Sequence, residues 1–268
     1  NLGCWGKLLM GASNLPKDQI ILIEREDEQT FVLGPDFKGL EMPVDRNRPD
    51  LKSFGAFTKI KTFEGKAFLC GSSRSLAKRI GPDRYDTRYL QLRPPRDGDV
   101  LKAGFRDFDM FSENDIYAAG GRGDLWHFNG EAWRQIHLPT NTWFETVCCG
   151  GDGMVYVSGY KGILFMGRED RWTKISDGGV VLGWDDMVWF EDRAWATGQM
   201  GLWNIKDGQV QRAPGLASEI KACSGNLYVN DGVMLMAGFG GACFRENGEW
   251  HSIFTRGDME QLIQEANK

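Results

Sequence analysis

The sequence is poor in the residues and motifs from which most catalytic centres are built. Only three histidines occur among its 268 residues, at His127, His137 and His251. The Gly-x-Ser-x-Gly, His-Glu-x-x-His and P-loop motifs are absent, and with them the usual marks of serine hydrolases, zinc proteases and nucleoside triphosphatases. We expect each histidine to be structural or exposed to solvent.

The chain also lacks a long apolar run and any excess of positive charge. Its most apolar stretch, 233–241, is only as long as a strand, whereas crossing a bilayer takes ~18 to 20 apolar residues. Thirty-two lysines and arginines against 37 aspartates and glutamates give a net charge of −5, which counts against broad binding to nucleic acid or anionic lipid. We therefore expect a soluble, cytoplasmic protein without a nucleic-acid or membrane partner.

Cysteines are few, and their spacing matches no metal site. The six are Cys4, Cys70, Cys148, Cys149, Cys223 and Cys243. No Cys-x-x-Cys pair is present, and two adjacent cysteines rarely form a relaxed disulfide. Reduced, buried thiols are the expected state, with disulfides between repeats as the alternative. No metal and no cofactor is predicted.

Glycine and aromatic residues, in contrast, are plentiful. The 35 glycines and 10 tryptophans indicate many tight turns between strands that carry large, flat side chains. With 41% hydrophobic and 26% charged residues, the chain has the balance of a folded protein. Composition alone therefore favours β structure.

A repeat of about forty residues is visible in the sequence. The segment 115–133 recurs at 154–172, 193–210 and 232–250. Its first glycine falls at Gly120, Gly159, Gly198 and Gly238, which are 39, 39 and 40 residues apart. A second glycine follows three residues after each of the first ones, at Gly123, Gly162, Gly201 and Gly241. Chance does not produce this regularity.

Each repeat predicts four short strands. In the second copy, these strands lie at 144–149, 155–158, 163–166 and 172–175. The hairpins of the repeats carry Asn129-Gly130, Asp207-Gly208 and Asn247-Gly248, dipeptides that adopt positive φ in tight reversals. Four antiparallel strands per ~40 residues form one blade of a β-propeller.

The whole chain, 1–268, is predicted to form one all-β domain, a six-bladed β-propeller of four-stranded antiparallel blades. The expected blades span 4–44, 52–93, 103–137, 142–176, 183–213 and 217–254. A short C-terminal helix is expected at 258–267, with Asp258 as its cap. Seven blades are the alternative, if residues before Asn1 supply more sheet.

The repeat carries a family resemblance. A strand of small residues that ends in glycine, a second glycine, an apolar strand, an Asn-Gly or Asp-Gly turn and a tryptophan together resemble the repeat of photosystem II assembly-factor and sialidase-like propellers. The pattern is also similar to propellers that act as immunity proteins against secreted bacterial toxins. The resemblance is clear over 112–254. The segments 129–133 and 247–250 lack the serine and first aspartate of the sialidase Asp box, which counts against glycan hydrolysis.

Carboxylates are predicted near the propeller axis, on the innermost strands. They are Asp107, Asp109, Glu145, Asp185 and Asp186. Two carboxylates about 5 to 9 Å apart can hydrolyse a glycosidic bond, and such a cluster can hold Ca²⁺. The simpler interpretation is that these groups are solvated or paired with Arg106.

One face of a propeller gathers the loops that join second to third strands and fourth to first strands, and we predict that a protein partner binds there. The candidate residues are Glu24, Glu26, Asp27, Glu28, Arg46, Arg48, Arg96, Trp143, Tyr160, Lys161, Trp184, Asp185, Met200 and Phe239. Aromatic anchors supply affinity, and the charges around them steer and select a partner. The alternative is a charged face that is only solvated.

The leading hypothesis is a non-enzymatic propeller that binds another protein. The resemblance implies an immunity protein that neutralises a cognate secreted toxin by covering its active site in a 1:1 complex. A nuclease is the favoured target, because the acidic run 24–28 can imitate phosphate. An assembly factor or chaperone is the second binding role. A glycan-acting hydrolase or lyase that uses the channel carboxylates is the alternative from another class.

Overall fold

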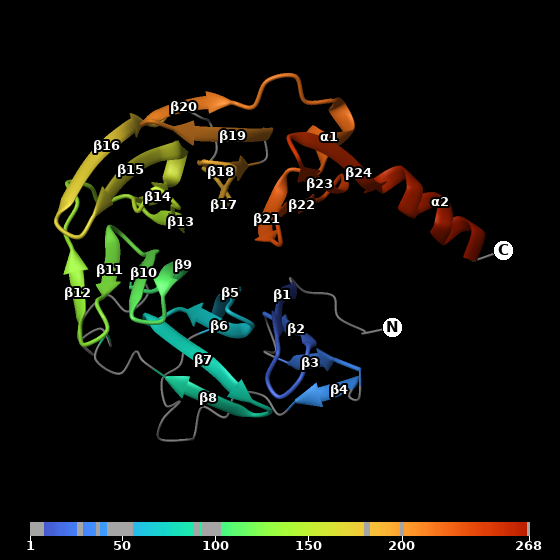
Figure 1. Cartoon of the computed structure of the whole chain (residues 1–268), viewed down its shortest axis with the longest axis horizontal. Coiled ribbons are helices and arrows are strands. Elements are labelled where there is room, and N and C mark those ends of the chain that lie inside the picture. Colours follow the sequence, from blue (N-terminus) through green and yellow to red (C-terminus); the bar gives the residue numbers. More distant parts are fainter. Residues whose placement is uncertain are drawn as a thin grey trace. The chain divides into compact units, whose positions relative to one another are not determined.

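The computed structural model describes residues 8–25, 29–35, 38–41, 56–87, 92, 103–179, 183–198 and 201–266. These residues form six four-stranded antiparallel sheets, each with its strands in chain order (Figure 1). The chain is therefore a six-bladed β-propeller, as predicted. It divides into two compact units, unit 1 (Asn1–Asn141) and unit 2 (Thr142–Lys268), with three blades in each.

Unit 1 contains the first three blades. Blade 1 consists of β1 (Leu8–Ser13), β2 (Gln19–Glu24), β3 (Thr30–Leu33) and β4 (Lys38–Glu41). Blade 2 consists of β5 (Phe57–Phe63), β6 (Lys66–Gly71), β7 (Ser75–Gly81) and β8 (Arg84–Thr87). Blade 3 consists of β9 (Phe105–Ser112), β10 (Asp115–Gly120), β11 (Asp124–Phe128) and β12 (Trp133–Ile136).

Unit 2 contains the other three blades and the helices. Blade 4 consists of β13 (Phe144–Cys149), β14 (Val155–Gly159), the 3-10 turn η3 (Tyr160–Gly162), β15 (Ile163–Arg168) and β16 (Arg171–Asp177). Blade 5 consists of β17 (Asp186–Phe190), β18 (Arg193–Gly198), β19 (Gly201–Lys206) and β20 (Gln209–Arg212). Helix α1 (Ser218–Ala222) precedes blade 6, which consists of β21 (Gly225–Asn230), β22 (Val233–Gly238), β23 (Gly241–Glu246) and β24 (Glu249–Thr255). Helix α2 (Arg256–Ala266) follows.

Two of the three predicted dipeptide hairpins are tight reversals. Asp207 and Gly208 have φ of 50° and 71°, and Asn247 and Gly248 have φ of 49° and 83°. The third differs, because positive φ occurs only at Gly130. Here the Asn129 side chain accepts hydrogen bonds from the backbone N–H groups of residues 131 and 132, as expected for an Asx turn.

The first glycine of each repeat has a common structural role. It ends the second strand of its blade and lies against the backbone that enters the innermost strand of the same blade. A Cβ at these positions would collide with a backbone carbonyl oxygen, in the pairs Gly120 with Gly104, Gly159 with Trp143, Gly198 with Gly183, and Gly238 with Ser224. The regular spacing in the sequence thus reflects a close backbone contact that only glycine permits.

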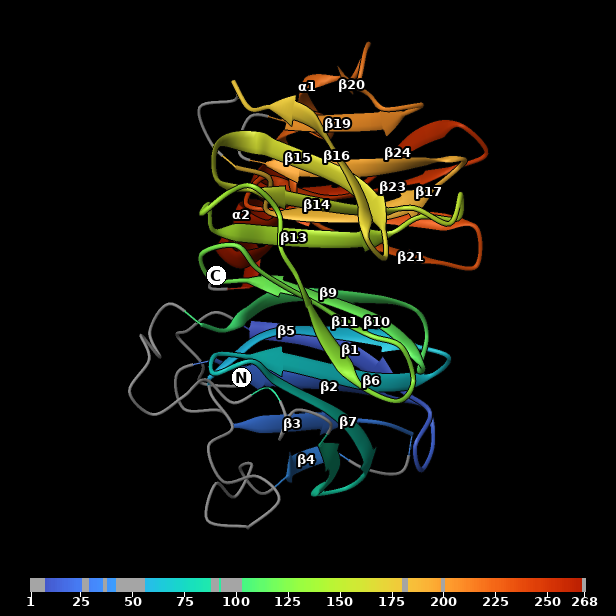
Figure 2. The same cartoon turned by 90° about the vertical axis from the view of Figure 1, so that its left-hand side faces the viewer.

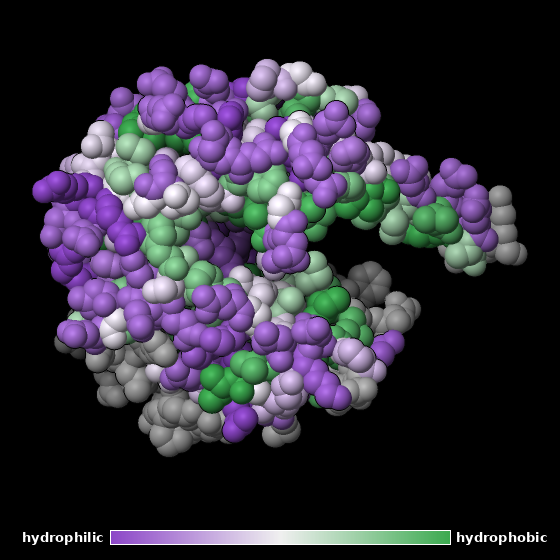
Figure 3. Space-filling model, viewed as in Figure 1, coloured by the Kyte–Doolittle hydropathy of each residue, from purple (hydrophilic) through white to green (hydrophobic). Residues whose placement is uncertain are grey.

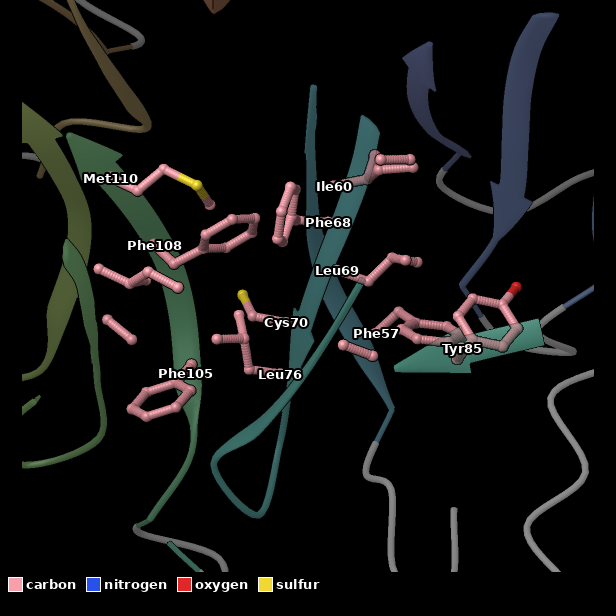
Figure 4. Close-up of a cluster of buried hydrophobic side chains, with 14 of the residues drawn as sticks. Phe57, Ile60, Phe68, Leu69, Cys70, Leu76, Tyr85, Phe105, Phe108 and Met110 are labelled. Carbon is pink, nitrogen blue, oxygen red and sulfur yellow. The ribbon is translucent and has the colours of Figure 1, made fainter. Parts of the chain in front are cut away.

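In unit 1 an apolar core runs between the blades. Phe108 on β9 faces Phe68 on β6, while Phe57 and Tyr85 pack on the other side of blade 2 (Figure 4). The long strands β5, β6 and β7 lie side by side in Figure 2. Burial raises the pKa of the Tyr85 hydroxyl to about 12.

Ion pairs also cross the blade junctions of unit 1. The fully buried Arg79 of blade 2 binds the Glu41 carboxylate of blade 1. Between blades 2 and 3, Lys61 lies 3.1 Å from Asp107. Glu113 on the β9–β10 hairpin, also of blade 3, binds two lysines of blade 2, Lys66 and Lys78, each at 2.6 Å. Arg74 lies 2.8 Å from Asp124.

In unit 2 the blade junctions are mainly aromatic. Tyr156 of blade 4 stacks on Trp189 of blade 5, with 6.1 Å between ring centroids. Trp195 of blade 5 meets Trp250 of blade 6 edge to face at 6.4 Å. The Asp186 carboxylate accepts a hydrogen bond from the backbone N–H of Leu227, at 2.9 Å, which also joins blades 5 and 6.

The five cysteines that the structure describes are thiols, as expected. Four are buried, and Cys149 is half-buried. Burial raises the pKa of the Cys70 thiol to about 12. Among the described residues, neither helix is long and apolar enough to span a membrane.

Candidate protein-binding surface

Three large aromatic side chains are exposed at the ends of blades 4 and 6 in unit 2. Trp143 precedes β13, Tyr160 lies in η3 between β14 and β15, and Phe239 lies in the turn between β22 and β23. Their exposed fractions are 38%, 57% and 83%. Together with Lys161, these residues are called the loop surface below. All four were predicted for partner binding, and the structure gives all four exposed positions.

The part of the loop surface on blade 4 is held by its backbone. The Tyr160 N–H donates to the Trp143 carbonyl oxygen at 2.9 Å. Lys161 has a left-handed backbone, with φ of 61°, and its Nζ lies 5.6 Å from the centroid of the Tyr160 ring. A cation beside an exposed aromatic ring is a combination common at protein interfaces.

The part on blade 6 is a single aromatic residue next to a helix. The guanidinium carbon (Cζ) of Arg256, the first residue of α2, lies 4.2 Å from the centroid of the Phe239 ring. The Arg256 N–H donates to the Gly240 carbonyl oxygen at 2.8 Å. The helix therefore begins directly beside the most exposed ring of the loop surface.

Trp184 was predicted to be exposed on this face, and that prediction is wrong. The residue is 2% exposed. It precedes β17 and turns into a cluster that includes Cys148 and Leu164 of blade 4, and its ring tilts against Trp203 at 6.2 Å. Burying so large an apolar surface between two blades outweighs the exposure typical of a loop position.

Glu24 was predicted to belong to an exposed acidic loop, but it ends strand β2 and is 7% exposed. Its backbone N–H donates to the Gln29 carbonyl oxygen at 3.0 Å, which closes the hairpin between β2 and β3. The other acidic residues of that run, Glu26, Asp27 and Glu28, lie outside the described residues, as do Arg46, Arg48, Arg96 and Met200. Asp185 is exposed, as predicted.

Two of the five predicted channel carboxylates, Asp107 and Asp186, are buried and engaged with neighbouring blades. Asp107 is 1% exposed and pairs with Lys61, a partner that the sequence did not suggest. Asp186 is 2% exposed and accepts hydrogen bonds from the backbone N–H groups of Met187 and Leu227. Within the part of the chain that the structure describes, no group of three His, Cys, Asp or Glu residues is placed to hold a metal ion.

His127 has the structural role that was predicted. It is buried on β11, with Nε2 2.8 Å from the Asp115 carboxylate. Its ring stacks on Tyr117 with 4.2 Å between centroids.

Sequence reasoning missed a groove at the opposite end of blades 4 and 5, with a volume of about 370 Å³. It is lined by Gly151, Asp152, Tyr156, Trp189, Asp192, Lys206 and Asp207. The Tyr156 hydroxyl donates to Asp152 at 2.6 Å, and Lys206 lies 2.5 Å from Asp192. The Gly150-Gly-Asp-Gly153 hairpin was the only signal for it, and that segment predicts a turn rather than a groove.

No family model matches the chain. Immune protein Tsi7 of Pseudomonas aeruginosa is 26% identical to it over 180 residues, which are 67% of this chain and 58% of Tsi7. The match thus spans less than two thirds of that relative's length.

Solved structures share the fold at low sequence identity. YCF48 from Cyanidioschyzon merolae superposes with a TM-score of 0.58 at 12% identity, over 82% of this chain and 74% of YCF48. YCF48 bound to D1 peptide gives a TM-score of 0.59 at 11% identity, over 94% and 82%. PQQ-bound aldose sugar dehydrogenase from Streptomyces coelicolor gives 0.53 at 11%, over 92% of each chain. The chain is thus a six-bladed propeller that is similar to an immune protein in sequence and to YCF48 in structure, as its repeats predicted.

Proposed function

We propose that this chain is an immunity protein that binds a cognate toxin, blocks it, and has no enzymatic activity of its own. The observation that carries the proposal is the similarity to Tsi7, a protein named for an immune role, over two thirds of this chain. An immunity protein acts by binding, so it requires an exposed surface of suitable chemistry rather than a catalytic centre.

The loop surface has that chemistry. Trp143, Tyr160 and Phe239 present aromatic rings to solvent, and aromatic residues carry much of the binding free energy at protein interfaces. Lys161 and Asp185 add charges of both signs on the same unit. We propose that the toxin covers these residues in a 1:1 complex.

Two of the five predicted channel carboxylates support a binding role over hydrolysis. Asp107 and Asp186 are almost fully buried and engaged with neighbouring blades. A general acid or nucleophile in a glycosidase has to reach the substrate, and these two side chains do not reach solvent.

A nuclease is the toxin class we propose, with the encounter in the cytoplasm. Nucleases bind a polyanion and therefore present basic clefts, to which a chain of net charge −5 is attracted. Glu26, Asp27 and Glu28 of the acidic run stay a prediction for this contact.

A second candidate is a peptide-binding assembly role. The structural likeness to YCF48 bound to D1 peptide, with a TM-score of 0.59, favours it. The two roles differ in the partner, which is an inhibited enzyme in the first case and a protein under assembly in the second.

Affinity purification of the tagged chain from its native cells tests the proposal. We expect a complex of one chain with one enzyme, with its mass measured by light scattering and its activity lost on binding. Release of activity when the chain is removed, and inhibition when it is added back, would establish the immunity role. A partner without toxin activity would favour the assembly role, and a chain that stays alone would contradict both.

A further inference from the structure

Helix α2 has an apolar side that packs against nothing in the described chain. It spans Arg256–Ala266, and none of its residues is buried. Met259, Leu262 and Ile263 are 42%, 59% and 56% exposed. In Figure 3 apolar and polar residues alternate along this helix, which extends away from blade 6.

The apolar residues follow a single stripe. Met259, Leu262, Ile263 and Ala266 occupy positions i, i+3, i+4 and i+7 of the helix, the spacing of one face. In globular proteins such a stripe is buried against another element. A helix of 11 residues is shorter than the ~12 to 15 residues at which isolated helices become marginally stable in water, so a partner for this stripe would stabilise it.

A capping box begins the helix independently of any partner. The Asp258 carboxylate accepts hydrogen bonds from the N–H and hydroxyl of Thr255, at 2.7 and 2.8 Å. The Asp258 N–H donates back to the Thr255 hydroxyl at 3.3 Å. These bonds lower the pKa of Asp258. Thr255 is therefore the cap, and the prediction that Asp258 caps the helix is corrected by this geometry.

Carboxylates outnumber cations beside the stripe, with Asp258, Glu260 and Glu265 against Arg256. Asp258 and Glu265 lie along one side of it, and Glu260 lies along the other, by the 100° rotation per residue of an α-helix. The single cation, Arg256, is engaged with Glu260 at 2.7 Å and with the Phe239 ring. The stripe therefore has an anionic border on the side of Asp258 and Glu265, and the Arg256–Glu260 ion pair on the other side.

The stripe also continues the loop surface. Arg256 joins Phe239 to the first turn of α2, so a partner that covers Phe239 lies beside the helix. An apolar ring and an apolar helix face then form one extended contact area on unit 2.

We propose that the apolar side of α2 inserts into an apolar groove of the toxin whose rim carries lysine or arginine residues. This inference rests on the proposed immunity function and adds the chemistry of the partner's groove. Recognition of an amphipathic helix by a groove uses anchors at i, i+3, i+4 and i+7, the positions found here. The helix carries three carboxylates and one cation, so a second copy of it and an anionic bilayer would both meet it with charge of the same sign.

Photo-crosslinking in the full-length chain tests the contact. Leu262→p-benzoylphenylalanine places the probe on the stripe, Gln264→p-benzoylphenylalanine places it on the polar side of the same helix, and Phe239→p-benzoylphenylalanine reports on the loop surface. We expect the Phe239 and Leu262 probes to capture the same enzyme, and the Gln264 probe not to. The peptide captured at Leu262 should contain apolar residues next to lysine or arginine.

Affinity measurements with that purified enzyme give the size of the contact. The double variant Leu262→Ser/Ile263→Ser should weaken binding by about 100-fold, because it removes two apolar anchors. The matched control Gln261→Ser/Gln264→Ser, on the polar side, should bind within about threefold of the unmodified chain. Circular dichroism checks that both variants keep the β-sheet signal.

The outcomes separate the two proposals. Capture at Phe239 without capture at Leu262, or equal affinity of the two double variants, would overturn the helix inference and leave the immunity role standing. Capture of a second copy of the chain at Leu262 would replace the toxin groove by a dimer. Capture at none of the positions would overturn the helix inference and the loop surface as the binding site, whereas the immunity role is decided by the purification and inhibition experiment.

Discussion

Neighbouring blades are joined by ion pairs in unit 1 and chiefly by aromatic rings in unit 2. Arg79–Glu41, Lys61–Asp107 and the pairs of Glu113 cross the junctions of unit 1. In unit 2, Trp184 fills the space between blades 4 and 5, and Trp195 meets Trp250 between blades 5 and 6. Both halves of the sequence bury apolar side chains between their blades, and unit 1 adds several ion pairs to that packing. The stability of unit 1 should therefore depend more strongly on pH than that of unit 2.

Removing a buried ring from unit 2 has the largest expected effect. Trp184→Ala should lower the free energy of unfolding by about 3 to 5 kcal/mol, because it leaves a cavity between two blades. Urea denaturation followed by circular dichroism measures the change. Trp143→Ala, at an exposed position of the same unit, is the matched control. Its free energy of unfolding should stay within about 0.5 kcal/mol of that of the unmodified chain. Similar losses for the two variants would contradict the role assigned to Trp184.

Removing the charge at a unit 1 junction has the next largest effect. Glu113→Gln should lower the free energy of unfolding by about 1 to 2 kcal/mol at neutral pH, because Lys66 and Lys78 lose their shared carboxylate. The matched variant in unit 2, Glu191→Gln, removes a more exposed partner of Arg245. It should cost less than about 1 kcal/mol. Equal costs would remove the contrast between the units.

The same junction gives unit 1 a dependence on pH. Hydrogen bonds from Lys66 and Lys78 lower the pKa of Glu113 from its ordinary 4.5 to about 2. In acid the unfolded chain therefore takes up this proton first, and the stabilisation present above pH 4.5 is lost between pH 4.5 and about 2. Unfolding free energies measured across this range should converge for the unmodified chain and Glu113→Gln. Curves that stay parallel would show that the carboxylate contributes no pH-dependent stability.

The smallest predicted effect is local to the helix. Thr255→Ala removes the cap of α2 and should destabilise that helix by about 1 kcal/mol, while the blades keep their stability. Hydrogen exchange measures this as faster exchange of the α2 amides alone. Faster exchange throughout blade 6 would mean instead that the cap supports the sheet.

The strands were predictable from the sequence because their determinants are local. Gly120, Gly159, Gly198 and Gly238 mark a backbone contact within one blade, and the Asp-Gly and Asn-Gly turns fix hairpins of neighbouring strands. Each of these signals lies within a single repeat, so the period of the repeat was enough to locate the blades.

Burial and ion pairing were less predictable because they depend on a second blade. Trp184 occupies a repeat position predicted to be an exposed loop, yet its ring is buried between two blades. Lys66 and Glu113 are 47 residues apart and share no motif. The fold class therefore follows from the repeat. Which of the predicted surface residues are exposed became known only from the structure.

The glycines at the ends of the second strands also affect which residues of the loop surface can be substituted. Because they set the position of each loop through main-chain contacts, the side chains between the two glycines of a repeat contribute little to the geometry of the blade. Phe239 belongs to this class, and its ring is 83% exposed. Such positions can exchange one residue for another while the sheet beneath stays folded. The architecture thus separates the residues that build the protein from those that choose its partner, so recognition can diverge faster than the fold.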